Sequence, residues 1–295
     1  GREVRQANLT PRLLAKLLTM SYATSIGFRS QYTALADNPL SIVDDPEFRA
    51  LNPDMMTYIN GYDFTPAATL YAMSSDSDVM WALTSYINAD PEARAWLDGQ
   101  ADPWGMKVNP NYKGIVLPTV SWPSLDTTVN TLLAAVPCFG VTPLPWLPLV
   151  ASPVSNPATV SLNLQYGLSA SQIVCKDAGQ PNQKLVAAGR LIPGRRAMFG
   201  LVSLADAERY QIPTASLLSH TDRLAATAFT DSKGRTFVAP TQASLRAAAK
   251  LLAPDPALGT WVLPYASTLR GAAGAAAALR RLRPADRLGP GPAPP

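Results

Sequence analysis

Proline is the residue that most restricts how this chain can fold, with 28 prolines among 295 residues. A proline inside a helix removes a backbone hydrogen bond and clashes with the preceding turn, so frequent prolines favour short elements and many loops. The most apolar stretch, residues 132–150, is divided by Pro137, Pro143, Pro145 and Pro148. These prolines exclude a continuous helix there, and no run approaches the roughly 18–20 apolar residues of a membrane span. We expect an extended segment that wraps a surface.

The charge distribution separates the chain into two regions. The chain has a net charge of +4 and a pI of about 9.1. Residues 266–295 alone carry a net charge of +4, from five arginines and one aspartate (Arg270, Arg280, Arg281, Arg283 and Arg287 against Asp286). Residues 1–265 are therefore formally neutral. A neutral folded region gives no electrostatic reason to expect nucleic-acid binding. The segment after Tyr265 has no aromatic residue, and we expect a disordered Ala/Arg/Pro tail over 266–295.

The first half of the chain carries clear signals for helix starts. A polar cap followed by proline or acidic residues is typical of a helix N-terminus. These signals predict helices that begin after Thr10, Asp45, Ser74–Asp78 and Asp90. The last two are close enough in sequence to form a helical hairpin.

The second half of the chain alternates strand and helix patterns. Apolar strands at 198–202 and 237–238 precede helices capped by Ser203 and Thr241. Further strands are expected at residues 115–120, 159–164 and 261–263. Strands that alternate with helices predict an α/β protein with a partly parallel sheet.

The sequence contains no recognisable catalytic machinery. Its one histidine, His220, lies in a polar stretch without a nucleophile elbow, and the usual nucleotide-binding glycine motifs are missing. One histidine and two distant cysteines also argue against a transition-metal site. We therefore expect a protein without enzymatic activity and without a cofactor. Cys138 and Cys175 form a disulfide if the chain is secreted, and two buried free thiols are an equally good interpretation.

The segment Ser74–Asp78 is the candidate ligand site. A helix N-terminus beside Ser75 and Ser77 can hold an anion through its free N–H groups and hydroxyls. Asp76 and Asp78 repel a fully charged anion unless one of them accepts a proton from a protonated oxyanion. Ordinary helix capping is the favoured interpretation of these residues.

Several stretches resemble the extracellular phosphate-type substrate-binding proteins of ABC transporters in actinobacteria (residues 10–19, 44–53, 89–99, 102–114, 199–210 and 237–241). The resemblance covers roughly residues 8–265. It implies a periplasmic-binding-protein fold of type II with a ligand between two lobes, an extracellular or cell-surface location, and delivery to an ABC permease.

Two departures from that family affect what the resemblance implies. The Ser/Gly/Thr-rich oxyanion loop of phosphate binders is not found, and the tail replaces the family's last strand and helix. The chain, which opens without an initiator methionine, is therefore expected to be a partial domain over 1–265. Ser75 and Asp76, with Ser77, are the candidate ligand residues, and phosphate is the candidate ligand.

Three functions stay open on the sequence. The leading hypothesis is capture of a small oxyanion such as phosphate as two lobes close. A ligand-free surface interaction module on the same fold is the alternative. A secreted hydrolase is the third, and it requires acids such as Asp44–Asp45 and Asp76/Asp78 to be brought together in a cleft.

Overall fold

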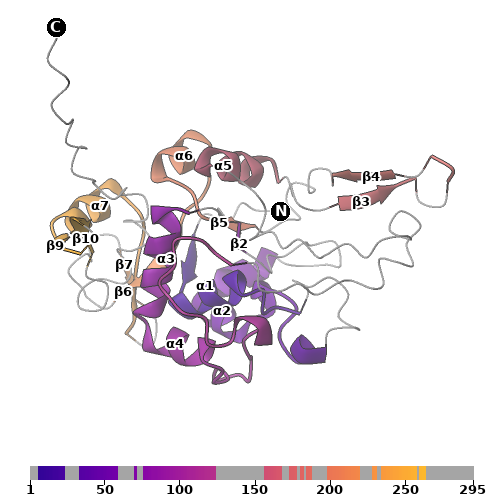
Figure 1. The fold of residues 1–295 in the computed structure, drawn as a ribbon, viewed down its shortest axis with the longest axis horizontal. Helices are drawn as coiled ribbons and strands as arrows, with labels where there is room; N and C mark the ends of the chain where they lie inside the picture. Colours follow the sequence, from indigo (N-terminus) through magenta and orange to yellow (C-terminus); the bar gives the residue numbers. More distant parts are fainter. Residues whose placement is uncertain are drawn as a thin grey trace, which may run out of the picture.

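The described part of the chain is a mixed α/β structure with several small sheets (Figure 1). The computed structural model describes residues 6–23, 33–58, 70–71, 76–123, 156–167, 173–177, 180–182, 184–187, 198–219, 228–230, 234–257 and 259–263. Among these residues, no helix has the length and apolar character needed to span a membrane. The proline-rich segment 132–150 and the tail 266–295 lie outside the described residues.

Four helices form one side of the molecule: α1 (Pro11–Leu18), α2 (Pro46–Leu51), α3 (Asp78–Asn88) and α4 (Pro91–Leu97). Helix α1 contacts α3 and α4, and α3 contacts α4, so the predicted hairpin is confirmed (Figure 1). All four begin at a side-chain N-cap, and three have proline at the first helical position. Three short 3₁₀ turns lie between α1 and α3 (Thr33–Leu35, Ile42–Asp44 and Pro53–Tyr58), and a fourth, Pro110–Tyr112, follows α4.

The largest sheet has four strands in the order β1-β6-β8-β7. Strand β1 (Ala7–Leu9) is parallel to β6 (Ala215–Ser219). Strand β8 (Thr236–Val238) is antiparallel to both β6 and β7 (Ala228–Thr230). The prediction of a partly parallel sheet is therefore confirmed.

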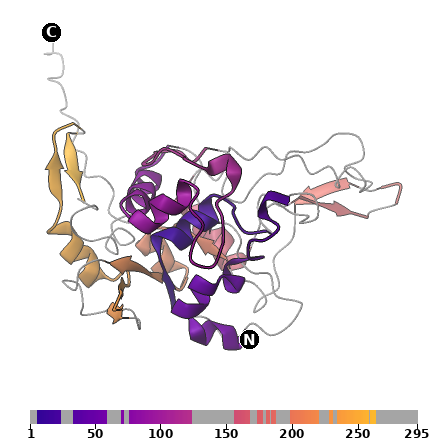
Figure 2. The same cartoon turned by 90° about the horizontal axis from the view of Figure 1, so that it is seen from below.

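Three two-stranded pairs complete the β structure. Strand β2 (Leu70–Tyr71) is parallel to β5 (Phe199–Gly200). The other two pairs are antiparallel: β3 (Ile173–Lys176) with β4 (Lys184–Ala187), and β9 (Ala253–Asp255) with β10 (Thr260–Val262). Figure 2 shows both antiparallel hairpins at opposite ends of the molecule, away from the helices α1–α4.

A side-chain amide closes the free edge of β1. Asn52, the C-cap of α2, accepts the Asn8 N–H through Oδ1 at 2.7 Å and donates from Nδ2 to the Asn8 carbonyl at 3.0 Å. Asn8 in turn donates from Nδ2 to the Leu51 carbonyl at 3.1 Å. The unpaired edge of a strand can otherwise pair with another chain. Here the Asn52 amide satisfies the N–H and the carbonyl of Asn8 at the edge of β1, without a further strand.

Three more helices lie in the second half: α5 (Pro157–Tyr166), α6 (Leu204–Arg209) and α7 (Gln242–Ala249). The predicted caps Ser203 and Thr241 are confirmed, and Thr241 forms a reciprocal capping box with Ser244.

Two of the strand predictions are wrong. Residues 159–164 belong to α5, because Asn156 caps that helix, Pro157 occupies its first position and Gly167 ends it with φ of 59°. Residues 115–120 form no strand, since Thr119 bonds the Thr84 hydroxyl through both its N–H and its carbonyl. The alternation of residues 159–164 predicts a strand there, but the cap, the proline and the terminal glycine favour a helix.

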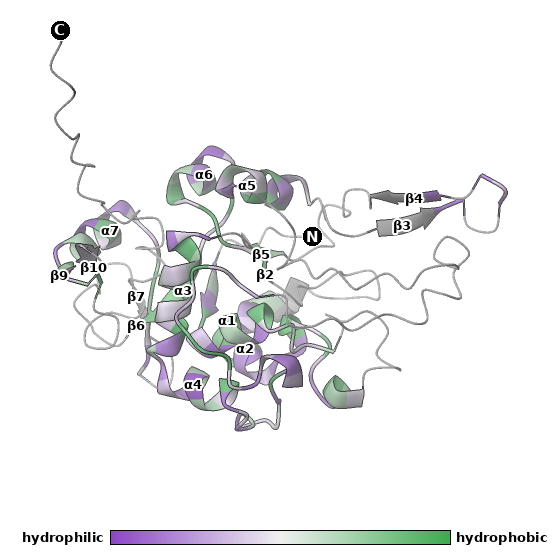
Figure 3. Cartoon of the chain, in the orientation of Figure 1, coloured by the Kyte–Doolittle hydropathy of each residue, from purple (hydrophilic) through white to green (hydrophobic). Residues whose placement is uncertain are grey.

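One large core joins these elements. It runs from β1 and α1 through α2–α4 to β8 and Leu263, and its fully buried large side chains include Trp96, Tyr86 and Phe48. A small separate cluster forms around Val160 of α5 with Met198 and Val202 near β5. Figure 3 shows that the helices α1–α4 carry both hydrophobic and hydrophilic residues.

Candidate functional site

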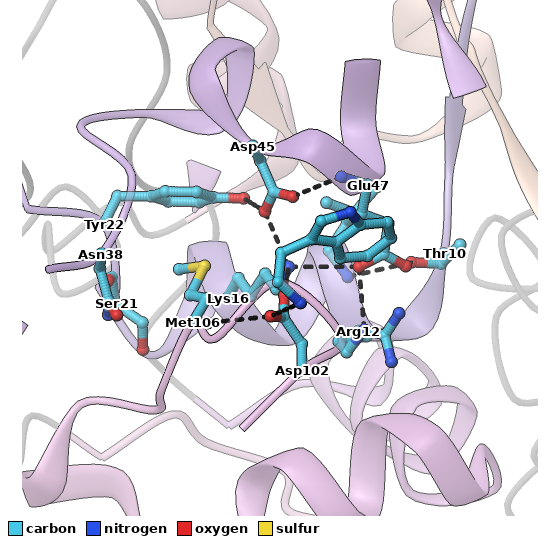
Figure 4. A network of polar contacts seen from close by, with 12 residues as sticks. Thr10, Arg12, Lys16, Ser21, Tyr22, Asn38, Asp45, Glu47, Asp102 and Met106 are labelled. Carbon is cyan, nitrogen blue, oxygen red and sulfur yellow. Dashed lines mark hydrogen bonds and ion pairs between the residues drawn. The ribbon is translucent and has the colours of Figure 1, made fainter. Parts of the chain in front are cut away.

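Five charged side chains meet inside the helical side of the molecule (Figure 4). Arg12 and Lys16 come from α1, Asp45 and Glu47 from the start of α2, and Asp102 from the turn after α4. All five are buried, with exposed fractions of 7% or less. We call this group the Lys16 cluster.

The Lys16 ammonium is the centre of the cluster. Its Nζ lies 2.7 Å from Asp102 Oδ2, 2.8 Å from Asp45 Oδ2 and 3.2 Å from Glu47 Oε2. Each of the three donor hydrogens of the ammonium thus has a carboxylate partner, which a buried lysine requires. The lysine side chain is fully buried, so Lys16 has no direct access to a substrate.

Glu47 lies at the N-terminal end of α1, where hydroxyl and cationic groups converge on it. Its Oε1 accepts from the Thr10 hydroxyl at 2.7 Å, and its Oε2 accepts from Arg12 Nε at 2.9 Å. A hydroxyl, a guanidinium and an ammonium near a helix start form the kind of environment that binds an oxyanion. The carboxylate of Glu47 fills this environment.

Asp45 has a structural and an electrostatic role at once. Its Oδ1 accepts the Glu47 N–H at 2.8 Å and caps α2, as the sequence predicted. Its Oδ2 accepts from Lys16 and from the Tyr22 hydroxyl, the latter at 3.0 Å. Tyr22 is fully buried beside it (Figure 4).

Asp102 shapes the turn that follows α4. Its Oδ1 accepts the N–H groups of Trp104 at 3.0 Å and Met106 at 2.9 Å, while its Oδ2 meets Lys16. Trp96 of α4 donates from Nε1 to the Met106 carbonyl at 3.0 Å. The turn is therefore bound to α1 by the ion pair between Asp102 and Lys16, and to α4 by the hydrogen bond from the Trp96 indole.

Burial and charge act against each other on the pKa values of the cluster. Burial alone would raise the pKa of Glu47, but Lys16 and Arg12 hold it below its usual value. Burial raises the pKa of Asp45, and Lys16 offsets this only in part. Burial would lower the pKa of Lys16, yet the surrounding carboxylates raise it. The pKa of Tyr22 is raised well above its ordinary value by burial and then by the charge of Asp45.

The three carboxylates also lie close enough together to surround a cation. One oxygen from each of Asp45, Glu47 and Asp102 lies within 4.8 Å of the others. The Lys16 ammonium already occupies a position in contact with all three. We therefore assign these carboxylates to ion pairing within the chain and not to metal binding.

The sequence did not predict the Lys16 cluster. Asp44–Asp45 was interpreted as a helix start, which is correct for Asp45, but the ion pairs were missed. One available signal was Lys16 itself, a charged residue among Leu13, Leu14, Leu17 and Leu18. A lysine within an apolar run predicts a buried partner.

Of the predicted ligand residues, Asp76 and Ser77 lie at the start of α3. Ser75 is outside the described residues, and so are Cys138 and His220. Asp76 is exposed, while Ser77 caps α3 by accepting the Met80 N–H at 3.1 Å and donates its own N–H to the Val120 carbonyl at 2.8 Å. Cys175 lies in β3. Because Cys138 is outside the described residues, the disulfide between the two stays a prediction.

A second feature is an open depression of about 620 Å³ between α6 and α7. Gln211, Thr214 and Gln242 contribute to its lining, and Glu208 is the one charged residue among the lining residues. An acidic lining does not favour an anionic ligand.

Comparison with known proteins gives no match: no protein-family model, no curated protein and no solved structure resembles the chain closely enough to be counted.

Proposed function

We propose that this chain is an extracytoplasmic solute-binding protein that captures a small oxyanion, with phosphate as the first candidate. The observation that supports the proposal most is the arrangement around β2 and β5. These strands are parallel, in the register Leu70 with Phe199 and Tyr71 with Gly200. Parallel strands bring their carboxyl ends to one edge, where open α/β sheets bind ligands.

Both strands lead at that edge into helices with a serine cap. Strand β2 is followed by residues 72–76 and then by Ser77, the cap of the eleven-residue helix α3. Strand β5 is followed within three residues by Ser203, the cap of α6. At the start of α3 the helix dipole and the Ser77 hydroxyl favour an anion, whereas the Ser203 hydroxyl of the short helix α6 already donates to Asp206 Oδ2 at 2.7 Å.

Asp76 gives the proposed site a preference among oxyanions. It is exposed next to the α3 cap, and its ionised carboxylate accepts a hydrogen bond from a protonated ligand. Hydrogen phosphate carries such a proton near neutral pH, whereas sulfate does not. The proposal therefore includes selection of phosphate over sulfate.

The wider proposal follows the sequence resemblance. A type II periplasmic-binding-protein fold, closure of two lobes, secretion and delivery to an ABC permease are all parts of it. The mixed α/β architecture and the parallel pair β2–β5 are compatible with this fold class.

Thermal unfolding with and without phosphate tests the proposal. Ligand at 100 times its dissociation constant stabilises the folded state by about 2.7 kcal/mol, which shifts the melting temperature by about 5–10 °C for a domain of this size. Sulfate at the same concentration is the ligand control. Asp76→Asn should reduce the preference for phosphate, and Asp98→Asn, at the end of α4, is the matched surface control.

One observation favours a second function, a ligand-free interaction module. The described site with the best chemistry for an oxyanion, at Thr10, Arg12 and Lys16, is filled by Glu47. The main hydrophobic core is also continuous from β1 to Leu263. A well-folded sample that shows no shift with phosphate would support this function and contradict oxyanion capture.

A further inference from the structure

We propose that the Lys16 cluster is a buried proton-binding site, in which Asp45 takes up one proton as the pH falls from neutral while the fold stays intact. This inference concerns a different part of the molecule from the anion site at α3. It therefore does not depend on the proposed function.

The charges within the cluster do not balance. Asp45, Glu47 and Asp102 carry three negative charges against the two positive charges of Arg12 and Lys16, and all five side chains are buried. Arg12 is also shared with Glu92, whose Oε2 lies 3.1 Å from its NH1. An excess negative charge in a medium of low polarity is unfavourable, and one proton removes it.

The hydrogen-bond partners show which carboxyl is best suited to take the proton. Glu47 is bonded to two cations, Arg12 and Lys16, which favours its ionised form. Asp102 is bonded to Lys16 and to two backbone N–H groups, which can only donate. Each of these two carboxylates therefore has an environment suited to a negative charge.

Asp45 differs from both. It has one cationic partner, Lys16, and its other side-chain partner is the Tyr22 hydroxyl at 3.0 Å. A hydroxyl can accept as well as donate, so Tyr22 can accept the new O–H of a protonated Asp45. The second oxygen of Asp45 continues to accept the Glu47 N–H and to cap α2.

The proton balance of the step is simple. A proton from solvent forms an O–H bond on Asp45 Oδ2, and the cluster changes from a net charge of −1 to zero. No other covalent bond to hydrogen is broken, and the Tyr22 hydroxyl changes from donor to acceptor in its hydrogen bond with Oδ2. The raised pKa of Asp45 agrees with this assignment. The charged and titratable groups around Asp45 come from four segments. Arg12 and Lys16 belong to α1, Tyr22 to the segment after α1, Glu47 to α2, and Asp102 to the turn after α4. Glu92 of α4 lies further away, on the other side of Arg12.

Linkage gives the sign of the effect on stability. A carboxyl whose pKa is higher in the folded state than in the unfolded state binds protons preferentially when folded. Its contribution to stability is fully present below the unfolded pKa, near 3.9, and is lost as the pH rises through the folded pKa. The folded state should therefore gain stability from Asp45 as the pH is lowered from neutral through the folded pKa of this carboxyl towards about 3.9.

Two measurements on the full chain test the proposal. In the wild type, carboxyl-carbon NMR should show Asp45 titrating at a higher pH than Glu47 without unfolding. In denaturant unfolding, the midpoint should rise as the pH is lowered from neutral towards about 4 in the wild type, and Asp45→Asn should lose this rise. Asp90→Asn is the matched control, because Asp90 caps α4 in the same Asp-Pro-Glu sequence, and this variant should keep the rise.

The outcomes separate clearly. A proton taken up by Glu47 or Asp102, or an Asp45 that stays ionised until the chain unfolds, would overturn the proposal. An unchanged pH slope in a folded Asp45→Asn variant would do the same. If Asp45→Asn does not fold, the NMR titration of the wild type still decides the question.

Discussion

Lys16 Nζ lies 2.7 Å from Asp102 Oδ2, although the two residues are 86 positions apart in the chain. This ion pair connects the middle of α1 to the turn after α4, and the same ammonium connects α1 to α2 through Asp45 and Glu47. The helices α1 and α2 and the turn after α4 therefore share one electrostatic centre.

Replacing Lys16 should cause a large loss of stability. Lys16→Met keeps the apolar stem but leaves three buried carboxylates facing one another, and breaking a buried pair in this way costs about 3–5 kcal/mol. Urea unfolding followed by tryptophan fluorescence measures the loss. Lys107→Met, at an exposed lysine, should change stability by no more than about 0.5 kcal/mol. Similar effects of the two substitutions would contradict the central role of Lys16.

Glu47 and Glu92 should respond very differently to the same substitution. Glu47→Gln removes a buried charge bonded to Arg12 and Lys16, whereas the Glu92 side chain is 68% exposed and its pair with Arg12 should contribute at most about 1 kcal/mol. The free energy of unfolding at neutral pH should therefore fall by several kcal/mol more for Glu47→Gln than for Glu92→Gln. Equal losses would show that burial does not govern these pairs.

Acid should weaken the fold through Glu47. Its pKa is lower in the folded state than in the unfolded state, so its contribution to stability is present above the unfolded pKa, near 4.3, and is lost as the pH falls below it. Denaturant unfolding below about pH 4.5 should show a steep loss in the wild type and a shallower one in Glu47→Gln. If Glu47→Gln loses stability with falling pH as steeply as the wild type, other carboxyl groups cause the acid sensitivity.

Alkaline pH should weaken the fold through Lys16 and Tyr22. Both have raised pKa values in the folded state, so their stabilisation is complete below the unfolded values, near 10, and is lost as the pH rises above them. Urea unfolding should show a midpoint that falls above about pH 10. Tyr22→Phe should reduce this fall, and Tyr166→Phe, at an exposed tyrosine, should leave it unchanged.

Asn52 should be necessary for the edge of the main sheet. Asn52→Ala removes both bonds to the β1 backbone and leaves the N–H and the carbonyl of Asn8 without these partners, at a cost of about 1–3 kcal/mol for each buried group. Hydrogen exchange of the Asn8 amide should accelerate together with the loss in global stability. An exchange rate equal to that of the wild type would show that another group satisfies the edge.

The sequence by itself determined where most of the helices begin. Thr10, Asp45, Asp90, Ser203 and Thr241 were all recognised as caps, because a cap depends on residues within one turn of it. The same local reasoning was wrong for residues 159–164, where strand-like alternation was weighed above the Asn-Pro start and the glycine end of α5. Local signals were sufficient for these elements when all of them were considered.

The candidate site depended on contacts that local patterns do not contain. The sequences Asp45-Pro46-Glu47 and Asp90-Pro91-Glu92 are identical, and both build the same capped helix start. Glu47 is nevertheless buried against Lys16, while Glu92 is exposed and reaches only the rim of the cluster through Arg12. Only the tertiary structure determines this difference, because the packing of α2 and α4 on α1 buries the Glu47 carboxylate and leaves the Glu92 carboxylate exposed to solvent.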